Sequence, residues 1–384
     1  MDFSLRTLLD LVPRLISRRS LEGRGSCRAG NLQERGGSAG ASPSRWRLRL
    51  LLALLFAWSL SGQPSSFDSA SALLADEPAE ERADRAPSCG TDAEDKARAR
   101  KRPMTKRAAF KRCAPQAVNI EVIGRDNEGK WASHGAGSIL HEDGYILTCE
   151  HVTVSGVSHK VTLRDGSEFD YKVLGRAGGS YDTAVLKIET DEPLPTVTLG
   201  RSDDVRVGQR AMVIGNAGGR PHTVNYGVVE QVACGGGTQI HIGKANILPG
   251  DSGGPVFNLH GEQIAHVHVK ITTMQNASRH IRIDHVRDAF AKVFMNEDRY
   301  DYAIGIEVDC HADDCPVTSV AADSPAAEAG VRVGDVITQL DSMRIGMGLH
   351  YVLALMDRVG ADPVTLAIDR DGEALAVEVT PRRQ

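Results

Sequence analysis

PGDSGGPV, at residues 249–256, is the most specific pattern in this sequence. It places Ser252 between small residues on a predicted tight turn, where the hydroxyl stands clear of other side chains. Gly250 lets the chain turn so that its own N–H and that of Ser252 point to one position. Such a position suits an oxygen that gains negative charge during acyl transfer. The same residue types are common in surface turns, but the eight-residue pattern favours a catalytic serine.

Two stretches upstream can supply the base and the acid that a catalytic serine needs. DGYILTCEHV, at residues 143–152, predicts a turn and a strand that ends near His151, where an imidazole can take the hydroxyl proton. YDTAVLKI, at residues 181–188, places Asp182 before an apolar strand, where its carboxylate can hold the other imidazole nitrogen. Each residue alone would be an ordinary structural residue. The order His151, Asp182, Ser252 is the chymotrypsin order.

The three blocks resemble the HtrA (Deg) family of exported serine proteases, and the resemblance covers about residues 115–384. Other matching segments are GAGSI at 135–139, GNAGG at 215–219 and TVNYGVV at 223–229. The resemblance implies a mostly β fold, with a chymotrypsin-like double β-barrel followed by one PDZ domain. It also implies that His151, Asp182 and Ser252 are catalytic, with the N–H groups of Gly250 and Ser252 forming the oxyanion hole.

Residues 113–298 are predicted to form the trypsin-like serine protease domain. Strand-like runs separated by turn signals are typical of a pair of all-β barrels; these runs are 118–123, 161–163, 183–188, 211–214 and 223–229. In the resembled family the strand predicted at 263–269 pairs with the substrate backbone. Apolar residues share one face of a helix predicted at 284–294, which closes the domain.

Residues 299–384 are predicted to form the PDZ domain, a small α/β sandwich. SPAAEAGVRVGDVI, at 324–337, resembles the helix-turn-strand signature of bacterial PDZ domains. Ser324 is the expected N-cap, Pro325 the first helical residue and Gly330 the stop. Further elements are a helix at 349–358 and strands at 364–368 and 374–379.

PDZ domains bind a peptide as an added strand, and backbone N–H groups capture its C-terminal carboxylate. The matching loop is AIGI at residues 303–306. Gly305 would let the N–H groups approach the anion, while Ile304 and Ile306 would line the apolar pocket. The alternative is a plain strand that contains a glycine.

Residues 1–75 combine an arginine-rich region with the apolar run LLLALLFAW at 50–58. This run is shorter than the ~20 residues that span a bilayer. Small residues follow it, so we expect a secretory signal peptide. Because the preceding region is long, either translation starts downstream of Met1 or the segment stays as a short membrane anchor. Both predict export, to the periplasm or to a membrane facing it; a buried helix is the alternative.

Residues 76–112 form an acidic block followed by a basic block. Blocks of like charge with few apolar residues predict a disordered linker. A basic patch for anionic polymers or lipid, or a processing site, is the alternative. The formal net charge of −5 over 384 residues gives no indication of nucleic-acid binding.

The chain has seven cysteines. Cys310 and Cys315 flank a short loop, and an oxidising compartment favours a disulfide between them. A metal site that includes His311 is the less favoured reading, because no second ligand pair is evident. His266 and His268 share one side of a strand and could also hold a metal, although a pocket or solvent-facing surface is more ordinary. We therefore predict no metal and no cofactor.

The sequence departs from the HtrA pattern at Asp251, where the family usually has asparagine. An unpaired buried carboxylate is costly, so we expect Asp251 to have a local partner or to be exposed. The loops at 234–237 and 272–280 are also unusual, and their positions resemble those of the activation loops of the family. The activation details of the family are therefore not transferred.

The resulting prediction is an exported, ATP-independent serine endopeptidase of HtrA type that acts on unfolded or damaged proteins. Its PDZ domain would recognise peptide C-termini, and the family implies a homotrimer or a multiple of trimers. The alternative is a PDZ-containing binding protein or chaperone on a protease-like scaffold. Esterase activity is disfavoured by the triad order and the PDZ domain.

Overall fold

The computed structural model describes residues 102–126, 129–234, 237–270, 277–358 and 360–383. The predicted signal peptide or anchor lies outside the described residues, as do 76–101 of the predicted linker. Residues 235–236 of the loop at 234–237 and 272–276 of the loop at 272–280 are also outside them, as is residue 271. Within the described ranges, no helix is long and apolar enough to cross a membrane.

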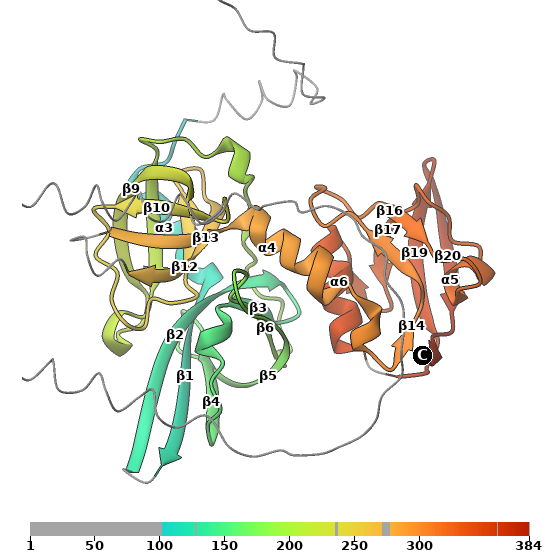
Figure 1. The fold of residues 1–384 in the computed structure, drawn as a ribbon, viewed down its shortest axis with the longest axis horizontal. Coiled ribbons are helices and arrows are strands. Elements are labelled where there is room, and N and C mark those ends of the chain that lie inside the picture. Colours follow the sequence, from blue (N-terminus) through green and yellow to red (C-terminus); the bar gives the residue numbers. More distant parts are fainter. Residues whose placement is uncertain (1–101, 127–128, 235–236, 271–276, 359, 384) are drawn as a thin grey trace, which may run out of the picture. The chain divides into compact units, whose positions relative to one another are not determined.

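The first barrel closes in the order β1-β2-β3-β6-β5-β4 (Figure 1). Its strands are β1 (Ala117–Asp126), β2 (Gly129–His141), β3 (Tyr145–Thr148), β4 (Ser158–Thr162), β5 (Glu168–Ala177) and β6 (Thr183–Ile188). Alternate residues of β1, Ile120 and Val122, are buried with Ile139, Ile146 and Leu186 in its core. This alternation is the strand period that the sequence predicts at 118–123.

The second barrel runs β11-β8-β9-β10-β13-β12 and closes through pairing of β11 with β12. Its strands are β8 (Arg210–Gly215), β9 (Thr223–Cys234), β10 (Gln239–Gly243), β11 (Pro255–Asn258), β12 (Glu262–Lys270) and β13 (Ala277–Arg282). A short strand, β7 (Thr198–Leu199), adds in parallel to β12. The predicted chymotrypsin-like double β-barrel is confirmed.

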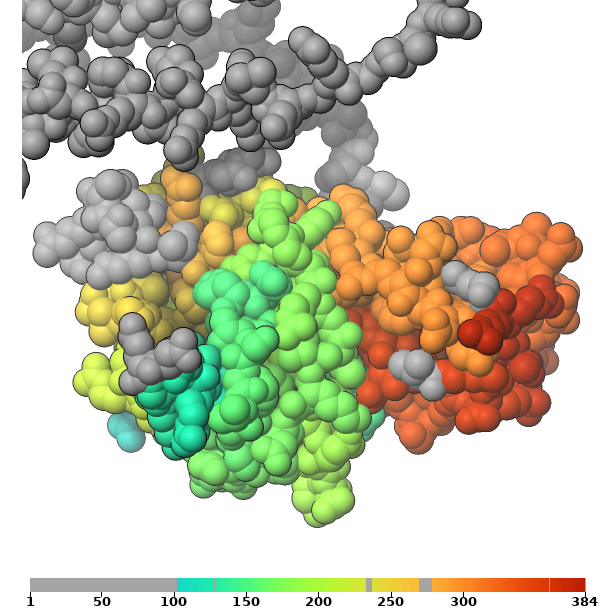
Figure 2. Space-filling model, turned by 60° about the horizontal axis from the view of Figure 1, so that its bottom comes forward, coloured from blue at the N-terminus to red at the C-terminus, as the bar shows by residue number. Residues whose placement is uncertain are grey.

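The two barrels pack against each other, and Figure 2 shows them side by side in cyan to green and in yellow. The contact includes hydrogen bonds between the ends of strands: His222 contacts Asn119 and the carbonyl of Ala117. The Ala136 N–H in β2 also donates to the carbonyl of Ser252. The pattern at residues 249–256 therefore lies where the barrels meet.

A helix, α3 (Lys106–Cys113), corrects the prediction that the linker is disordered to residue 112. Thr105 caps it by accepting from the Ala108 N–H. Ala109 and Cys113 are fully buried, and the Tyr226 hydroxyl donates to the Lys106 carbonyl. Burial against the second barrel thus orders a segment whose charges alone predict disorder.

The predicted helix at 284–294 is confirmed in position as α4 (Ile283–Ala289), which continues as a π-helical turn, η6 (Phe290–Phe294). Phe290 and Phe294 are both buried and their rings meet edge to face. The connecting turns are short 3₁₀ helices: η2 (Ala114–Gln116), η3 (Glu150–Val152), η4 (Ser202–Asp204), η5 (Ala217–Gly219) and η7 (Glu297–Arg299).

The C-terminal region forms three small sheets, with orders β18-β17-β19-β20, β15-β16 and β14-β21. Its strands are β14 (Tyr302–Ala303), β15 (Ile306–Val308), β16 (Val317–Val320), β17 (Val336–Leu340), β18 (Met343–Arg344), β19 (Val364–Arg370), β20 (Glu373–Val379) and β21 (Arg382–Arg383). The two predicted helices are α5 (Pro325–Glu328), capped by the Ser324 hydroxyl, and α6 (Gly348–Asp357).

The predicted disulfide between Cys310 and Cys315 is wrong in this structure, where both are free thiols. Each is 1% exposed and belongs to the apolar core. The two side chains therefore pack as small apolar groups. Burial raises the pKa of the Cys310 thiol to about 12, which disfavours the reactive thiolate.

Candidate active site

His151 and Asp182 are brought together by the pairing of β3 with β6. These strands are antiparallel, with Thr148 opposite Ala184, so the end of β3 lies beside the start of β6. Asp182 Oδ2 is 2.7 Å from His151 Nδ1, and Oδ1 accepts from the His151 backbone N–H at 3.0 Å. Both the ring and the backbone of His151 are therefore fixed by one carboxylate.

The electrostatics of this pair suit a base that is held by a buried anion. The hydrogen bond that the His151 ring donates to Asp182 raises the pKa of His151, although burial opposes it. Burial would raise the pKa of Asp182, but the hydrogen bonds from the His151 side chain and backbone outweigh it, so this pKa is lowered. The His151 side chain is 46% exposed and that of Asp182 only 8%. The His151 ring thus faces outward, while the Asp182 carboxylate stays inside.

The Ser252 turn packs directly against the end of β3. Gly253 has φ +81°, and a Cβ there would lie 2.2 Å from Thr148 Oγ1 and 2.9 Å from Cys149 N. The Gly253 N–H donates to the Val267 carbonyl at 2.9 Å. Among the described residues, no hydrogen bond joins Ser252 Oγ to His151. In substrate-free enzymes this bond often tightens only when substrate binds.

The backbone of Gly250 has the shape that an oxyanion hole requires. Its φ is +99°, and a Cβ would lie 2.1 Å from the Asn216 carbonyl oxygen, so no other residue fits without a shift. In the part of the chain that the structure describes, the N–H groups of Gly250 and Ser252 have no hydrogen-bond acceptor. They are free to meet a substrate oxygen, and their role as an oxyanion hole stays a prediction.

Asp251 has local partners, which is one of the two outcomes that we expected. The residue is fully buried. Its Oδ2 accepts from the Leu248 N–H at 2.9 Å and its Oδ1 from the Thr223 hydroxyl at 3.3 Å. Burial raises the pKa of Asp251, and these hydrogen bonds oppose the shift only in part.

His268 is a site residue that sequence reasoning did not place. Its Nε2 lies 3.4 Å from Asp182 Oδ2, and its Nδ1 is 3.2 Å from Gln239 Nε2. Because an amide N–H only donates, Nδ1 accepts and the proton of the neutral ring lies on Nε2. The one available signal was the pair of histidines on one strand. His266, in contrast, is fully buried, and its two ring nitrogens have no hydrogen-bond partner among the described residues.

One group near the site has ligand atoms close enough for a metal. Cys149, His151 and Asp182 each offer an atom, and these lie within 4.8 Å of one another. However, the Cys149 thiol donates to the Val267 carbonyl at 3.0 Å, and burial raises its pKa well above the usual value. The group is therefore explained by packing around the His151–Asp182 pair.

The loop at 303–306 in the C-terminal region turns at Gly305, and its role in capturing a carboxylate stays a prediction. Gly305 has φ +83°, and a Cβ there would lie 2.3 Å from Ser324 Cβ. Ile304 and Ile306 are 2% and 1% exposed, and Ile304 lines an adjoining cavity. The N–H groups of Ile304 and Gly305 point to the carboxylate of Glu297, a residue that sequence reasoning missed.

Comparisons with known proteins agree with the fold. The family description "Trypsin-like peptidase domain" matches residues 135–265, and "PDZ domain" matches residues 303–380. Both ranges fall inside the predicted domains, whose exact boundaries stay a prediction.

A probable periplasmic serine endoprotease DegP-like of Pseudomonas fluorescens is 33% identical over 303 residues, which are 72% of this chain and 61% of that protein. A putative serine protease HhoB of Synechocystis is 29% identical over 285 residues, 64% of this chain and 66% of that protein. A solved HtrA-type protease AlgW with decapeptide is 24% identical, with a TM-score of 0.45, over 73% of this chain and 99% of that one.

The chain therefore joins a trypsin-like peptidase domain to a PDZ domain, and the predicted resemblance to the HtrA family is confirmed. It spans about three fifths of the length of the DegP-like relatives that it matches.

Proposed function

We propose that the protein is an ATP-independent serine endopeptidase of HtrA type that acts on unfolded polypeptides. One observation carries the proposal: Asp182 holds both the ring nitrogen and the backbone of His151, beside a glycine-rich turn that presents Ser252. This arrangement supports hydrolysis over the alternative of a binding protein on a protease-like scaffold, because a scaffold does not need a buried carboxylate on an outward-facing imidazole.

The proposed reaction uses each residue in one role. Ser252 Oγ attacks the peptide carbonyl while His151 Nε2 takes its proton and later gives it to the leaving amine. Asp182 keeps the proton of the neutral ring on Nδ1, so that Nε2 is free to act as the base, and stabilises the imidazolium. The N–H groups of Gly250 and Ser252 receive the carbonyl oxygen as it becomes negative.

We further propose that the PDZ domain binds peptide C-termini in the groove between β15 and α6. The carboxylate would meet the N–H groups of the 303–306 loop. Among the described strands β15 pairs with β16 alone, which leaves one edge for an added strand. Helix α6 lies next to the end of β15. A Cβ on Gly348, at the start of the helix, would lie 2.4 Å from the Asp309 carbonyl oxygen. Leu355, near the end of the helix, lines the cavity beside Ile304.

Export to the periplasm is part of the proposal, since the matched relatives are named periplasmic. Attachment to a membrane through the N-terminal segment and assembly as a homotrimer, or a multiple of trimers, are proposed from the family resemblance. Light scattering of the purified protein would test the assembly.

The test of the activity is cleavage of casein by the full-length protein, with Ser252→Ala as the matched control. Cleavage by the wild type alone would establish the peptidase and its nucleophile. If neither protein cleaves casein, even with an excess of peptides with free C-termini, hydrolysis would be rejected in favour of the binding protein.

A further inference from the structure

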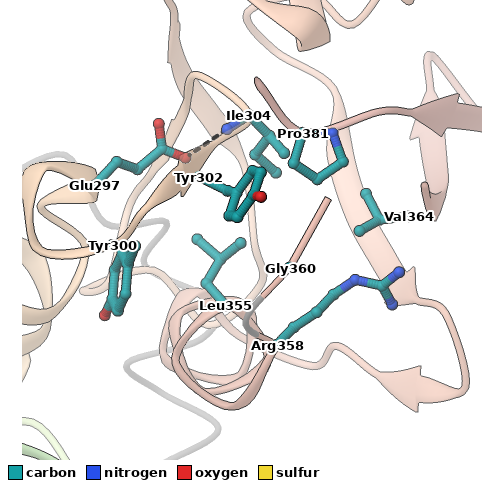
Figure 3. A pocket seen from close by; sticks show the side chains of 9 residues that line it. All are labelled: Glu297, Tyr300, Tyr302, Ile304, Leu355, Arg358, Gly360, Val364 and Pro381. Carbon is teal, nitrogen blue, oxygen red and sulfur yellow. Dashed lines mark hydrogen bonds between the residues drawn. The ribbon is translucent and has the colours of Figure 1, made fainter. Parts of the chain in front are cut away.

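A carboxylate already occupies the N–H groups of the 303–306 loop, and it belongs to this chain. Glu297 Oε1 accepts from Ile304 N–H at 3.1 Å and from Gly305 N–H at 3.2 Å, and Oε2 accepts from Gly305 N–H at 3.0 Å. Figure 3 shows the Glu297 side chain turned toward the Ile304 backbone. The loop thus holds both oxygens of one carboxylate.

This contact has the chemistry of a peptide C-terminus. In both cases a two-oxygen anion meets successive backbone N–H groups, and such charge-assisted bonds are stronger than neutral ones. The Gly305 N–H cannot serve two carboxylates at full strength. Binding of Glu297 and binding of a peptide C-terminus at this loop therefore exclude each other.

Glu297 is presented by a turn that is held in place on both sides. It opens η7, and Asn296 caps this turn by accepting from the Asp298 N–H at 3.0 Å. The Tyr300 N–H donates to the Glu297 carbonyl at 2.8 Å, and the Tyr300 hydroxyl donates to the Phe294 carbonyl at 2.7 Å. Because the turn is already ordered, the carboxylate reaches the loop at little entropic cost and at high effective concentration.

A cavity lies beside the loop, and the Glu297 side chain forms part of its wall. Its lining includes the apolar side chains of Ile304, Leu355 and Val364, together with Glu297 itself and Tyr302 (Figure 3). Departure of Glu297 would leave more of this cavity to the side chain of a peptide's last residue.

The bound carboxylate of Glu297 is held against a cost. Burial raises the pKa of Glu297, and the nearby charges of Glu307 and Asp298 raise it further. The hydrogen bonds from the N–H groups of Ile304 and Gly305 lower it in part. A competitor that takes over the loop lets Glu297 return to water. The contact is therefore suited to exchange.

We propose that Glu297 is an internal ligand of the PDZ carboxylate loop, which a peptide C-terminus must displace in order to bind. The inference rests on the proposed function of this loop as a site for peptide C-termini. It adds an autoinhibitory contact: if the loop is free for only 1–10% of the time, peptide affinity is lowered by about tenfold to a hundredfold.

The test measures peptide binding by the full-length protein carrying Ser252→Ala, so that peptides are not cleaved. The probes are fluorescent peptides that differ in their last residue, each as a free acid and as a C-terminal amide. Glu297→Gln keeps the shape and removes the charge, whereas Glu297→Asp keeps the charge but shortens the reach. Asp298→Asn, at an exposed neighbour, is the matched control for loss of one negative charge.

We expect Glu297→Gln and Glu297→Asp to bind the preferred free acids at least tenfold more tightly than the parent and Asp298→Asn do, with the amides bound weakly by all. Equal affinities for the free acids would overturn the internal ligand but leave the PDZ proposal standing. Absence of any preference for acids over amides, in every variant, would overturn both. Unfolding temperatures identify a misfolded variant, and either Glu297 variant alone then decides the outcome.

Discussion

His268 Nε2 lies 3.4 Å from Asp182 Oδ2, the same oxygen that is 2.7 Å from His151 Nδ1. The Asp182 carboxylate therefore faces two imidazoles, one exposed and one half-buried. Burial lowers the pKa of His268, against the pull of Asp182, so this ring stays neutral where His151 titrates. Its proton on Nε2 can support the Asp182 anion without adding a charge to the site.

From this relationship we expect His268→Leu to lower kcat about fivefold, because a polar contact to a buried carboxylate contributes about 1 kcal/mol. KM should stay unchanged, since His268 acts through Asp182. Steady-state kinetics on an unfolded substrate would measure both constants. His260→Leu, in the turn before β12, is the control; equal kcat values for the two variants would remove His268 from the positioning of Asp182.

The Asp182–His151 pair predicts a stronger effect and a pH signature. Asp182→Asn should lower kcat by about 10⁴-fold, because the ring loses its orienting acceptor and adopts the wrong tautomer. His151 must be neutral to act as a base, and its pKa is raised above 6.5. Wild-type activity should therefore fall as the pH drops through a value above 6.5.

The measurement is kcat/KM against pH for both proteins. The residual activity of Asp182→Asn should fall only at a lower pH than the wild-type activity does, since the contact that raises the pKa of His151 is gone. An acid limb at the same pH in both would show that another group controls it.

Whether a site residue can be predicted from the sequence depends on how far along the chain its contacts lie. His151, Asp182 and Ser252 were predictable because each stands in a local pattern, and β3–β6 pairing then brings the first two together. His268 was not, since its approach to Asp182 joins β12 of one barrel to the start of β6 in the other. No local pattern encodes a contact of this kind.

The same reasoning explains two errors. Helix α3 was predicted as disordered because its charges dominate the local composition, whereas Ala109 and Cys113 become buried only against the folded barrel. Glu297 was overlooked because its partner is a backbone loop eight residues away, reached through a 3₁₀ turn. Both contacts depend on tertiary structure, and the hydrophobic periodicity of the sequence does not reveal tertiary contacts.

Replacement of the buried Asp251 by asparagine is expected to stabilise the protein by an amount that depends on pH. Its folded pKa is raised above 3.8 by burial, so the folded state prefers the protonated form and loses stability as the pH rises through that raised pKa. Asp251→Asn removes the buried charge and keeps an acceptor for the Leu248 N–H. We expect the variant to gain about 1 kcal/mol at pH 8.

Urea unfolding at pH 8 and near pH 3.8 would test this. The gain should shrink at the lower pH, where the wild-type side chain is also neutral. A loss of stability at pH 8 would mean that the charge itself is needed by Leu248 and Thr223.

The buried histidines of the second barrel predict acid sensitivity of the fold. Burial lowers the pKa of His266 to about 3, although Asp182 pulls it upward; His268, His151 and His285 push it down. The unfolded chain takes up this proton near pH 6.5, and the folded state does not. Stability is therefore present above 6.5 and is lost as the pH falls toward 3.

Substitution of His266 isolates its share. His266→Leu removes a ring without hydrogen-bond partners among the described residues, so the variant should be at least as stable as the wild type at pH 7.5. At pH 5.0 it should be more stable by about 2 kcal/mol, since each pH unit below 6.5 costs the wild type about 1.4 kcal/mol for one such proton.

His280 offers the contrast, because its pKa is lowered to about 3 by burial as well, but its Nε2 is 2.7 Å from Ser278 Oγ. His280→Leu should therefore lose stability at pH 7.5 and regain part of it at pH 5.0. Urea unfolding of the three proteins at both pH values measures the differences, and parallel pH dependences would show that neither histidine stays neutral in the folded state.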